Sequence, residues 1–330
     1  MQNKKIPFVW TEIGRNPGNY VFNAININSQ LFPDQPRYLI LSKEFSKNIK
    51  DLNCEVIYEE QLGETKNSKQ FWNTPKNWSW SQNNYWTNTT RRFFILEQFL
   101  EKYKIEKLIH MESDTILLNK KYIDELYEIP EWGIKYTKQD ATTGCASVFL
   151  VNSLASLKDF NSFVLENWAD PTETDMTLLS KYQNLKSHDS FLPSGDLNIF
   201  DTVFDAGTIG RYFLGGDARN NRFPFSTRGI LPNTREFFDP SRYVIESDSD
   251  LIKLVDKNLK SLNLACVHIH SKRIPKNLNK LVKSLIKESN VKRTRFWKLG
   301  VLDLGVINER TKSFIQRRIM RNKVADPRIR

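Results

Sequence analysis

The chain has 330 residues, of which 39% are hydrophobic and 12% aromatic, so it can fill a substantial core and is not a disordered chain. No stretch reaches the roughly 18 uncharged apolar residues of a membrane-spanning helix, and the N-terminal residues lack the apolar core of a signal peptide. We therefore expect a cytoplasmic protein with one main domain.

The net charge of +11 is concentrated at the C-terminal end. Residues 271–330 contain 18 Lys and Arg against 4 Asp and Glu, whereas the rest of the chain is nearly neutral. Such a segment favours phosphate-bearing partners, either nucleic acid or an anionic membrane surface. In 291–330, apolar side chains lie among the basic ones, which suits an amphipathic helix at a membrane or a solvated basic face packed on the body. We therefore divide the chain into a catalytic domain, 1–290, and a basic tail, 291–330.

Short apolar runs that alternate with helical stretches predict an α/β fold with a mostly parallel sheet covered by helices on both faces. In chain order, we expect strands at 8–10, 38–41, 54–58, 107–111, 116–118, 132–136, 145–151 and 264–269. We expect helices at 20–27, 87–103, 122–127, 153–168, 174–183, 278–288 and 310–323. A polar loop at 64–86 carries four tryptophans, as a lid or as a core plug, and 186–245 shows no assignable pattern.

The strand expected at 107–111 runs directly into Glu112 and Asp114. Open α/β sheets bind ligands at the carboxyl ends of their strands, and two carboxylates there suit a hard cation that shares its shell with phosphates. Bound Mn²⁺ or Mg²⁺ would neutralise a diphosphate leaving group. Taken alone, the same triplet also fits a solvated acidic turn.

A second polar strand end follows much later in the chain. His268 and His270 alternate at the end of an apolar run, with Lys272 and Arg273 directly after them. Period-two spacing places both imidazoles on one face, where one could complete a metal shell while the cations hold a diphosphate. One core histidine and one surface histidine are the alternative.

Together, the two strand ends resemble the metal and diphosphate elements of GT-A-fold glycosyltransferases. A strand ending in Glu-x-Asp is similar to their Asp-x-Asp motif, and the late His-x-His with a following basic residue resembles their C-terminal element. Segment 143–150 is similar to the strand that lines the acceptor side. The resemblance spans residues 5–290 and departs from the usual motif in having Glu112 first.

The resemblance implies transfer of a hexosyl-type sugar from a nucleoside diphosphate sugar to a hydroxyl of a glycan or lipid-linked glycan, in surface glycan or glycolipid synthesis. It implies Asp114 as a metal ligand and Glu112 as a ligand or ribose contact. We prefer His270 to His268 as the third ligand, because His268 is expected to be buried. Lys272 or Arg273 would stabilise the leaving diphosphate.

The resemblance also implies donor binding by Arg92, on the helix before the metal strand, and a general base at Asp175, at the start of a later helix. Acids in a first helical turn are also common without a function, because they favour the helix dipole. Asp205 and Asp217, from a glycine-rich segment, compete for the role of base.

Two other function classes fit parts of the sequence. A nucleic-acid-binding protein would use the basic tail, although no recognition motif accompanies it, so we expect no nucleic-acid partner. A metal hydrolase would use His268 and His270 with an acid, and it would also draw on His110 and His188, the remaining histidines.

Overall fold

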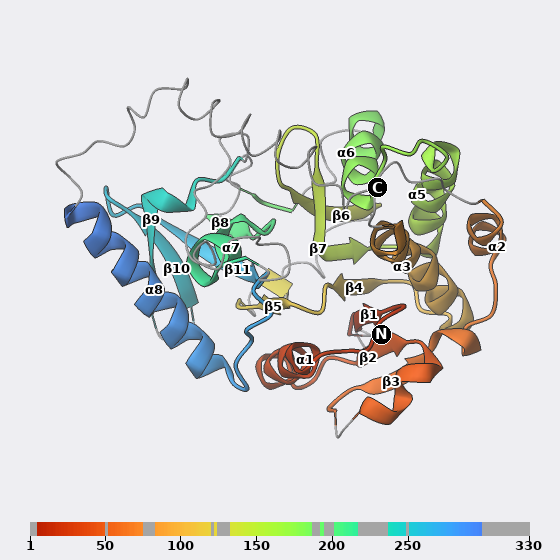
Figure 1. Ribbon diagram of the computed structural model, residues 1–330, viewed down its shortest axis with the longest axis horizontal. Helices are drawn as coiled ribbons and strands as arrows, with labels where there is room; N and C mark the ends of the chain where they lie inside the picture. The colour runs from red at the N-terminus through yellow and green to blue at the C-terminus, as the bar shows by residue number, and fades with distance from the viewer. Residues whose placement is uncertain are drawn as a thin grey trace, which may run out of the picture.

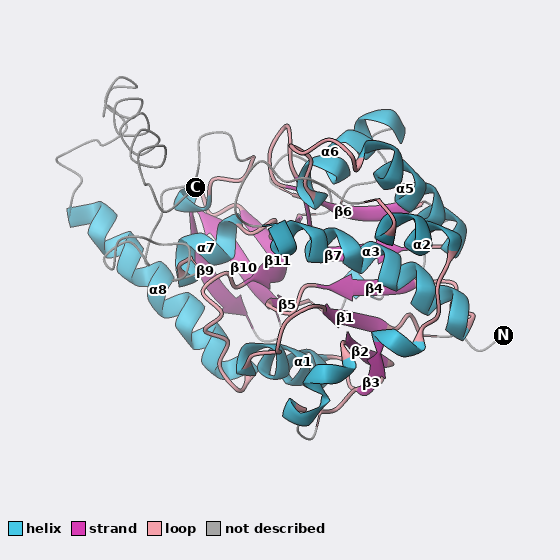
Figure 2. Ribbon diagram, turned by 45° about the vertical axis from the view of Figure 1, so that its right-hand side comes forward, coloured by secondary structure: helices cyan, strands magenta, loops and turns pink. Residues whose placement is uncertain are grey.

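The computed structural model describes residues 5–49, 52–74, 83–119, 122–123, 133–186, 192–194, 201–216, 237–248 and 251–298. Its elements form two sheets that lie side by side, with helices packed around them (Figures 1 and 2). Among the described helices, none combines the length and hydrophobicity needed to cross a bilayer.

The first sheet has six strands in the order β3-β2-β1-β4-β7-β6. The strands β1 (Phe8–Glu12), β2 (Arg37–Leu41), β3 (Glu55–Tyr58) and β4 (Leu108–Met111) are parallel to one another. Beyond β4, the strand β7 (Gly144–Val151) pairs antiparallel with β4, and β6 (Ile134–Lys138) pairs antiparallel with β7. The predicted α/β class with a mostly parallel central sheet is therefore confirmed.

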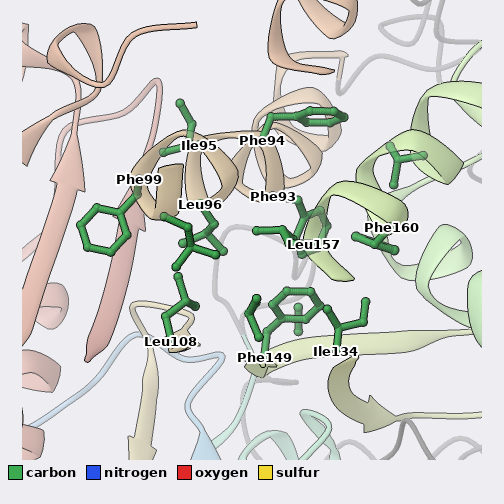
Figure 3. Packing of buried hydrophobic residues seen from close by; sticks show 14 of the residues in the cluster. Phe93, Phe94, Ile95, Leu96, Phe99, Leu108, Ile134, Phe149, Leu157 and Phe160 are labelled. Atoms are coloured by element: carbon green, nitrogen blue, oxygen red, sulfur yellow. The ribbon is translucent and has the colours of Figure 1, made fainter. Parts of the chain in front are cut away.

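Helices cover both faces of this sheet. One face carries α2 (Lys66–Trp72), α3 (Asn83–Tyr103), α5 (Leu154–Asn167) and α6 (Asp175–Lys186), whose apolar side chains meet the sheet in one core cluster. At its centre Phe93 of α3 lies 5.1 Å, between ring centroids, from both Phe149 of β7 and Phe160 of α5 (Figure 3). The opposite face packs on α1 (Asn19–Leu31), with Val21 and Ile25 buried against it.

The second sheet has the order β5-β11-β10-β9, formed by β5 (Thr115–Leu117), β11 (Ser261–His268), β10 (Leu251–Asp256) and β9 (Tyr243–Asp248). These pairings are antiparallel, while β8 (Thr202–Phe204) pairs with β11 in parallel. The helices α7 (Thr208–Leu214) and α8 (Leu278–Lys298) pack on this sheet. Short 3-10 turns lie at Lys43–Asn48, Glu59–Gln61 and Pro240–Arg242.

Strand β5 joins the two sheets at one point. It follows β4 after the turn of residues 112–114, in which the Thr115 amide donates to the Glu112 carbonyl at 2.9 Å. Its register on β11 sets Thr115 opposite His268, and the Ile269 amide donates to the Asp114 carbonyl at 2.8 Å. The two polar strand ends singled out in the sequence are thus brought together.

Several predicted elements differ in extent. The helix predicted at 87–103 begins at Asn83, and the expected loop at 64–86 contains α2, which Thr65 caps by accepting from the Ser68 amide. The strand β10 was not predicted. Of the helix expected at 122–127 only residues 122–123 are described, and the helix expected at 310–323 lies outside the described residues. The basic helix α8 crosses residue 290 without a break.

Candidate active site

Three side chains converge where β4 and β11 end. The Nε2 atom of His268 lies 3.0 Å from Oε2 of Glu112 and 3.1 Å from Oδ1 of Asp114. One potential ligand atom from each of the three residues lies within 4.8 Å of the others, and in the described part of the chain no other group of three or more Asp, Glu, His or Cys side chains does so. Two carboxylates and one imidazole are an oxygen-rich donor set that suits Mn²⁺ or Mg²⁺.

Electrostatics couple the three groups tightly. Burial alone would lower the pKa of His268, but the carboxylates of Asp114 and Glu112 outweigh burial and hold that pKa well above its ordinary value. Burial opposes ionisation of Asp114, yet the cations of His268 and Lys272 hold its pKa below the usual range. The cluster therefore carries ionised carboxylates at neutral pH, as a cation site requires.

Lys272 reaches the same carboxylate from the turn after β11. Its Nζ donates to Oδ2 of Asp114, and its backbone is held at φ 57°, in the left-handed region that costs a non-glycine residue free energy. The next residue, Arg273, is exposed, and it is not among the residues that line the cavity described below. Of the two cations predicted to hold a diphosphate, only Lys272 lies beside the cluster.

Arg92, on the sheet-facing side of α3, connects the cluster to α6. Its Nη1 donates to Glu112 at 2.5 Å and its Nη2 donates to Asp175 at 2.7 Å. Arg92 and Asp175 are buried, and the charges of Glu112 and Asp175 outweigh the effect of burial and raise the pKa of Arg92, which keeps it a cation. Asp175 is the first residue of α6, so Arg92 ties the start of that helix to the end of β4.

The predicted base Asp205 has a different environment. Its carboxylate accepts four backbone N–H bonds, from Gly207, Ile209, Gly210 and His268, at 2.7 to 2.9 Å. The side chain is fully buried and does not line the cavity. This geometry anchors α7 to β11 and leaves no lone pair directed at a substrate, so it gives Asp205 a structural role. Asp217, the other competing base, lies outside the described residues.

Of the two late histidines, the structure places His268 beside the carboxylates, whereas the sequence favoured His270. His268, although buried as expected, faces the carboxylates because β11 pairs with β5 through that residue. The chain turns after Ile269, and His270 stacks beside His268 with ring centroids 4.2 Å apart. Its Nε2 lies so near Gly207 that a Cβ there would come within 2.5 Å. His270 thus packs against the start of α7 and stands outside the ligand cluster.

A cavity of about 260 Å³ lies beside the cluster, between the end of β1 and the N-terminal half of α3. Besides Glu112, Asp114 and Lys272, its lining includes Arg15, Tyr85, Asn88, Thr89 and His110. Arg15 is held by the buried Glu12, with Nε 2.6 Å from Oε2 and Nη2 2.9 Å from Oε1. Arg15 was not among the predicted site residues, although its place just after β1, at the sheet edge of Glu112, was a usable signal.

His110 lies on β4 at the floor of this region. Its Nδ1 lies 3.0 Å from the carbonyl oxygen of Val9, while its Nε2 has no hydrogen-bond partner among the residues that the structure describes. Burial, aided by the positive charge of Arg92, lowers the pKa of His110 to about 3, so the ring is neutral at physiological pH. A neutral ring that donates through Nδ1 presents Nε2 as an acceptor.

No protein-family model and no curated protein matches this sequence. Among solved structures, the chain is similar to the PaToxG glycosyltransferase, with 13% identity over 53% of this chain and 64% of that one, at a TM-score of 0.35. It is also similar to mouse xyloside xylosyltransferase 1, with 12% identity over 58% of this chain and 85% of that one, at a TM-score of 0.37. It is similar as well to a galactosyltransferase, LgtC, in complex with donor and acceptor sugar analogues, with 13% identity over 58% of this chain and 74% of that one, at a TM-score of 0.38. The match thus spans less than two thirds of PaToxG.

Proposed function

We propose that this chain is a metal-dependent glycosyltransferase of the GT-A type. It would move a hexosyl-type sugar from a nucleoside diphosphate sugar to an acceptor hydroxyl. The observation that carries the proposal is the convergence of Glu112, Asp114 and His268 at one edge of a mostly parallel sheet, beside a cavity that also presents Lys272 and Arg15. A site that combines a cation with further positive charge suits a diphosphate leaving group.

The side chains divide the work as follows. Asp114, Glu112 and His268 would hold Mn²⁺ or Mg²⁺, and the bound cation would neutralise charge that develops on the diphosphate. Lys272, which already contacts Asp114, supplies a second positive charge beside that position. Arg92 orients Glu112 through its hydrogen bond and can contact the donor from the cavity wall.

The general base belongs to the proposal as well. We retain Asp175, which is buried and, like Asp205, does not itself line the cavity, because a single guanidinium separates it from Glu112. The saturated carboxylate of Asp205 does not suit proton transfer.

Acceptor, location and domain limits are further parts of the same proposal. A glycan or lipid-linked glycan acceptor, in surface glycan or glycolipid synthesis, would suit a cytoplasmic enzyme whose basic tail, 291–330, rests on an anionic membrane. The catalytic unit would then be 1–290. Residues 299–330 of that tail lie outside the described residues.

The cluster disfavours a histidine-rich metal hydrolase. It contains a single histidine, and His110 turns its Nδ1 to the Val9 carbonyl instead of joining the carboxylates.

A thermal-shift screen of nucleoside diphosphates with and without Mn²⁺ tests the proposal. At 100 times the dissociation constant, a ligand that binds only the folded state adds about 2.7 kcal/mol, which raises Tm by on the order of 5 °C. We expect such a shift only when a nucleotide and Mn²⁺ are both present. Lys272→Met should reduce it, whereas Arg273→Met is the matched control that should retain it. Nucleotide shifts that are the same with and without Mn²⁺ would rule the proposal out.

A further inference from the structure

One residue that lines the cavity, His110, carries a buried acceptor that no described side chain or backbone group satisfies. His110 is only 1% exposed, its Nδ1 is committed to the Val9 carbonyl, and its Nε2 has no partner. Buried polar atoms are nearly always paired in folded proteins, because an unpaired acceptor forfeits its hydrogen bonds to water.

The position itself favours an apolar side chain. Alternation along β4 sends Leu108 and His110 toward the face that α3 covers, and Leu108 there joins the apolar core cluster. An aliphatic side chain at residue 110 would remove the unsatisfied Nε2, although it would also give up the hydrogen bond from Nδ1 to the Val9 carbonyl. Among the described residues the fold therefore gains nothing from the imidazole Nε2, which leaves this atom for a ligand.

The surroundings indicate where that partner lies. His110 lines the same cavity as Glu112 and Asp114, so a molecule that touches the proposed cation also passes over the imidazole. Thr11 from β1 and Asn88 and Thr89 from α3 line this cavity too. A polar ligand with several hydrogen-bonding groups fits such a lining better than an apolar one.

We propose that Nε2 of His110 accepts a hydrogen bond from an N–H or O–H group of the nucleotide sugar, which makes His110 a specificity-determining residue. This inference rests on the function proposed above. With Nδ1 donating to the Val9 carbonyl, Nε2 is the acceptor that the ring has left, so the site favours a ligand with a donor at that point and disfavours one that presents an acceptor there. The donor is either an N–H of the nucleobase or a hydroxyl of the sugar.

Two variants distinguish the effect of the acceptor atom from the effect of the side-chain volume. His110→Leu removes the acceptor and keeps an apolar side chain, whereas His110→Gln keeps an amide that can accept near the Nε2 position. Calorimetric titrations with Mn²⁺ would compare UDP, CDP, ADP and GDP, and then UDP-glucose and GDP-mannose, on both variants and the unaltered protein.

We expect His110→Leu to weaken binding of the preferred nucleotide about 10- to 100-fold, and His110→Gln to restore most of that loss. A penalty already present for the nucleoside diphosphate assigns the contact to the base, and a penalty only for the sugar-bearing form assigns it to a sugar hydroxyl. The affinity for Mn²⁺ alone should not change. The leucine removes an unsatisfied acceptor but also the hydrogen bond from Nδ1 to the Val9 carbonyl, and because these two effects oppose each other the ligand-free variant should melt within about 3 °C of the unaltered protein.

Equal affinities for every nucleotide in His110→Leu and the unaltered protein would overturn the inference and leave the proposed function standing. A large fall in Tm without ligand, or an equal loss of Mn²⁺ and of all nucleotides, would also overturn it, because a structural role for the imidazole predicts both. If the unaltered protein binds no nucleotide with Mn²⁺, the proposed function fails and this inference fails with it.

Discussion

Asp205→Asn tests whether this carboxylate anchors the second sheet or acts on a substrate. In the structure one oxygen accepts from the amides of Gly207 and Ile209, and the other accepts from Gly210 and His268. These bonds tie the start of α7 to the backbone of His268, the last residue of β11 and a proposed metal ligand.

The expected loss follows from the geometry. Asparagine keeps one accepting oxygen and turns an NH₂ group toward the other pair of amides, so two hydrogen bonds to a charged acceptor vanish. At about 1.5–3 kcal/mol for each bond, the free energy of unfolding should fall by roughly 3–6 kcal/mol. For a chain of this length, that corresponds to a Tm lower by about 6–12 °C.

Scanning calorimetry measures this loss directly. Asp170→Asn is the matched control, since Asp170 lies at an exposed turn, where its Oδ1 accepts from the backbone amide and the hydroxyl of Thr172. We expect the control to melt within about 2 °C of the unaltered protein. If Asp205→Asn melts normally and yet transfers no sugar, the structural interpretation is refuted and Asp205 becomes the base.

Three further predictions follow from the same region. Gly210→Ala should lower Tm by several degrees in a melting experiment, because its Cβ would lie 1.9 Å from the His268 carbonyl oxygen; an unchanged Tm would show that the contact relaxes freely. Arg92→Gln should cost about 3–5 kcal/mol in denaturant unfolding, since Glu112 and Asp175 lose their shared cation, and a loss below about 1 kcal/mol would contradict this. Without metal, the raised pKa of His268 stabilises the fold fully below pH 6.5, and this stabilisation is lost as pH rises through the raised value. The affinity for Mn²⁺ should rise over the same interval as His268 releases its proton, and a flat titration profile would exclude His268 as a ligand.

Both halves of the cluster were visible in the sequence because each is encoded locally. An apolar run of strand length predicts β4, and the polar residues that follow it, Glu112 and Asp114, must then lie at the sheet edge. In the same way, the apolar run that ends near residue 269 predicts a strand end, with His268 and His270 beside it. Neither step needs knowledge of a distant contact.

The choice between the histidines does require such knowledge. The register that opposes His268 to Thr115 joins segments far apart in the chain, and nothing near residue 268 encodes it. Burial does not argue against a ligand role for His268 here, because Asp114 is buried along with the imidazole.

The segment 186–245 resisted prediction for a related reason. The helix α7 has seven residues and begins after Gly207, whose backbone lies at φ 97° in the left-handed region. Four amide bonds to Asp205 set that start, and a hydrophobic period cannot show a hydrogen-bonded anchor.

Binding of Mn²⁺ tests the central claim most directly. The electron paramagnetic resonance signal of free Mn²⁺ would be followed as protein is added, with and without a nucleoside diphosphate, for the unaltered chain, Asp114→Asn and His268→Ala. We predict that the unaltered chain binds one Mn²⁺, more tightly when the nucleotide is present, and that both variants lose this binding while they remain folded. If both variants bind Mn²⁺ as the unaltered chain does, the end of β4 and the end of β11 do not form a cation site.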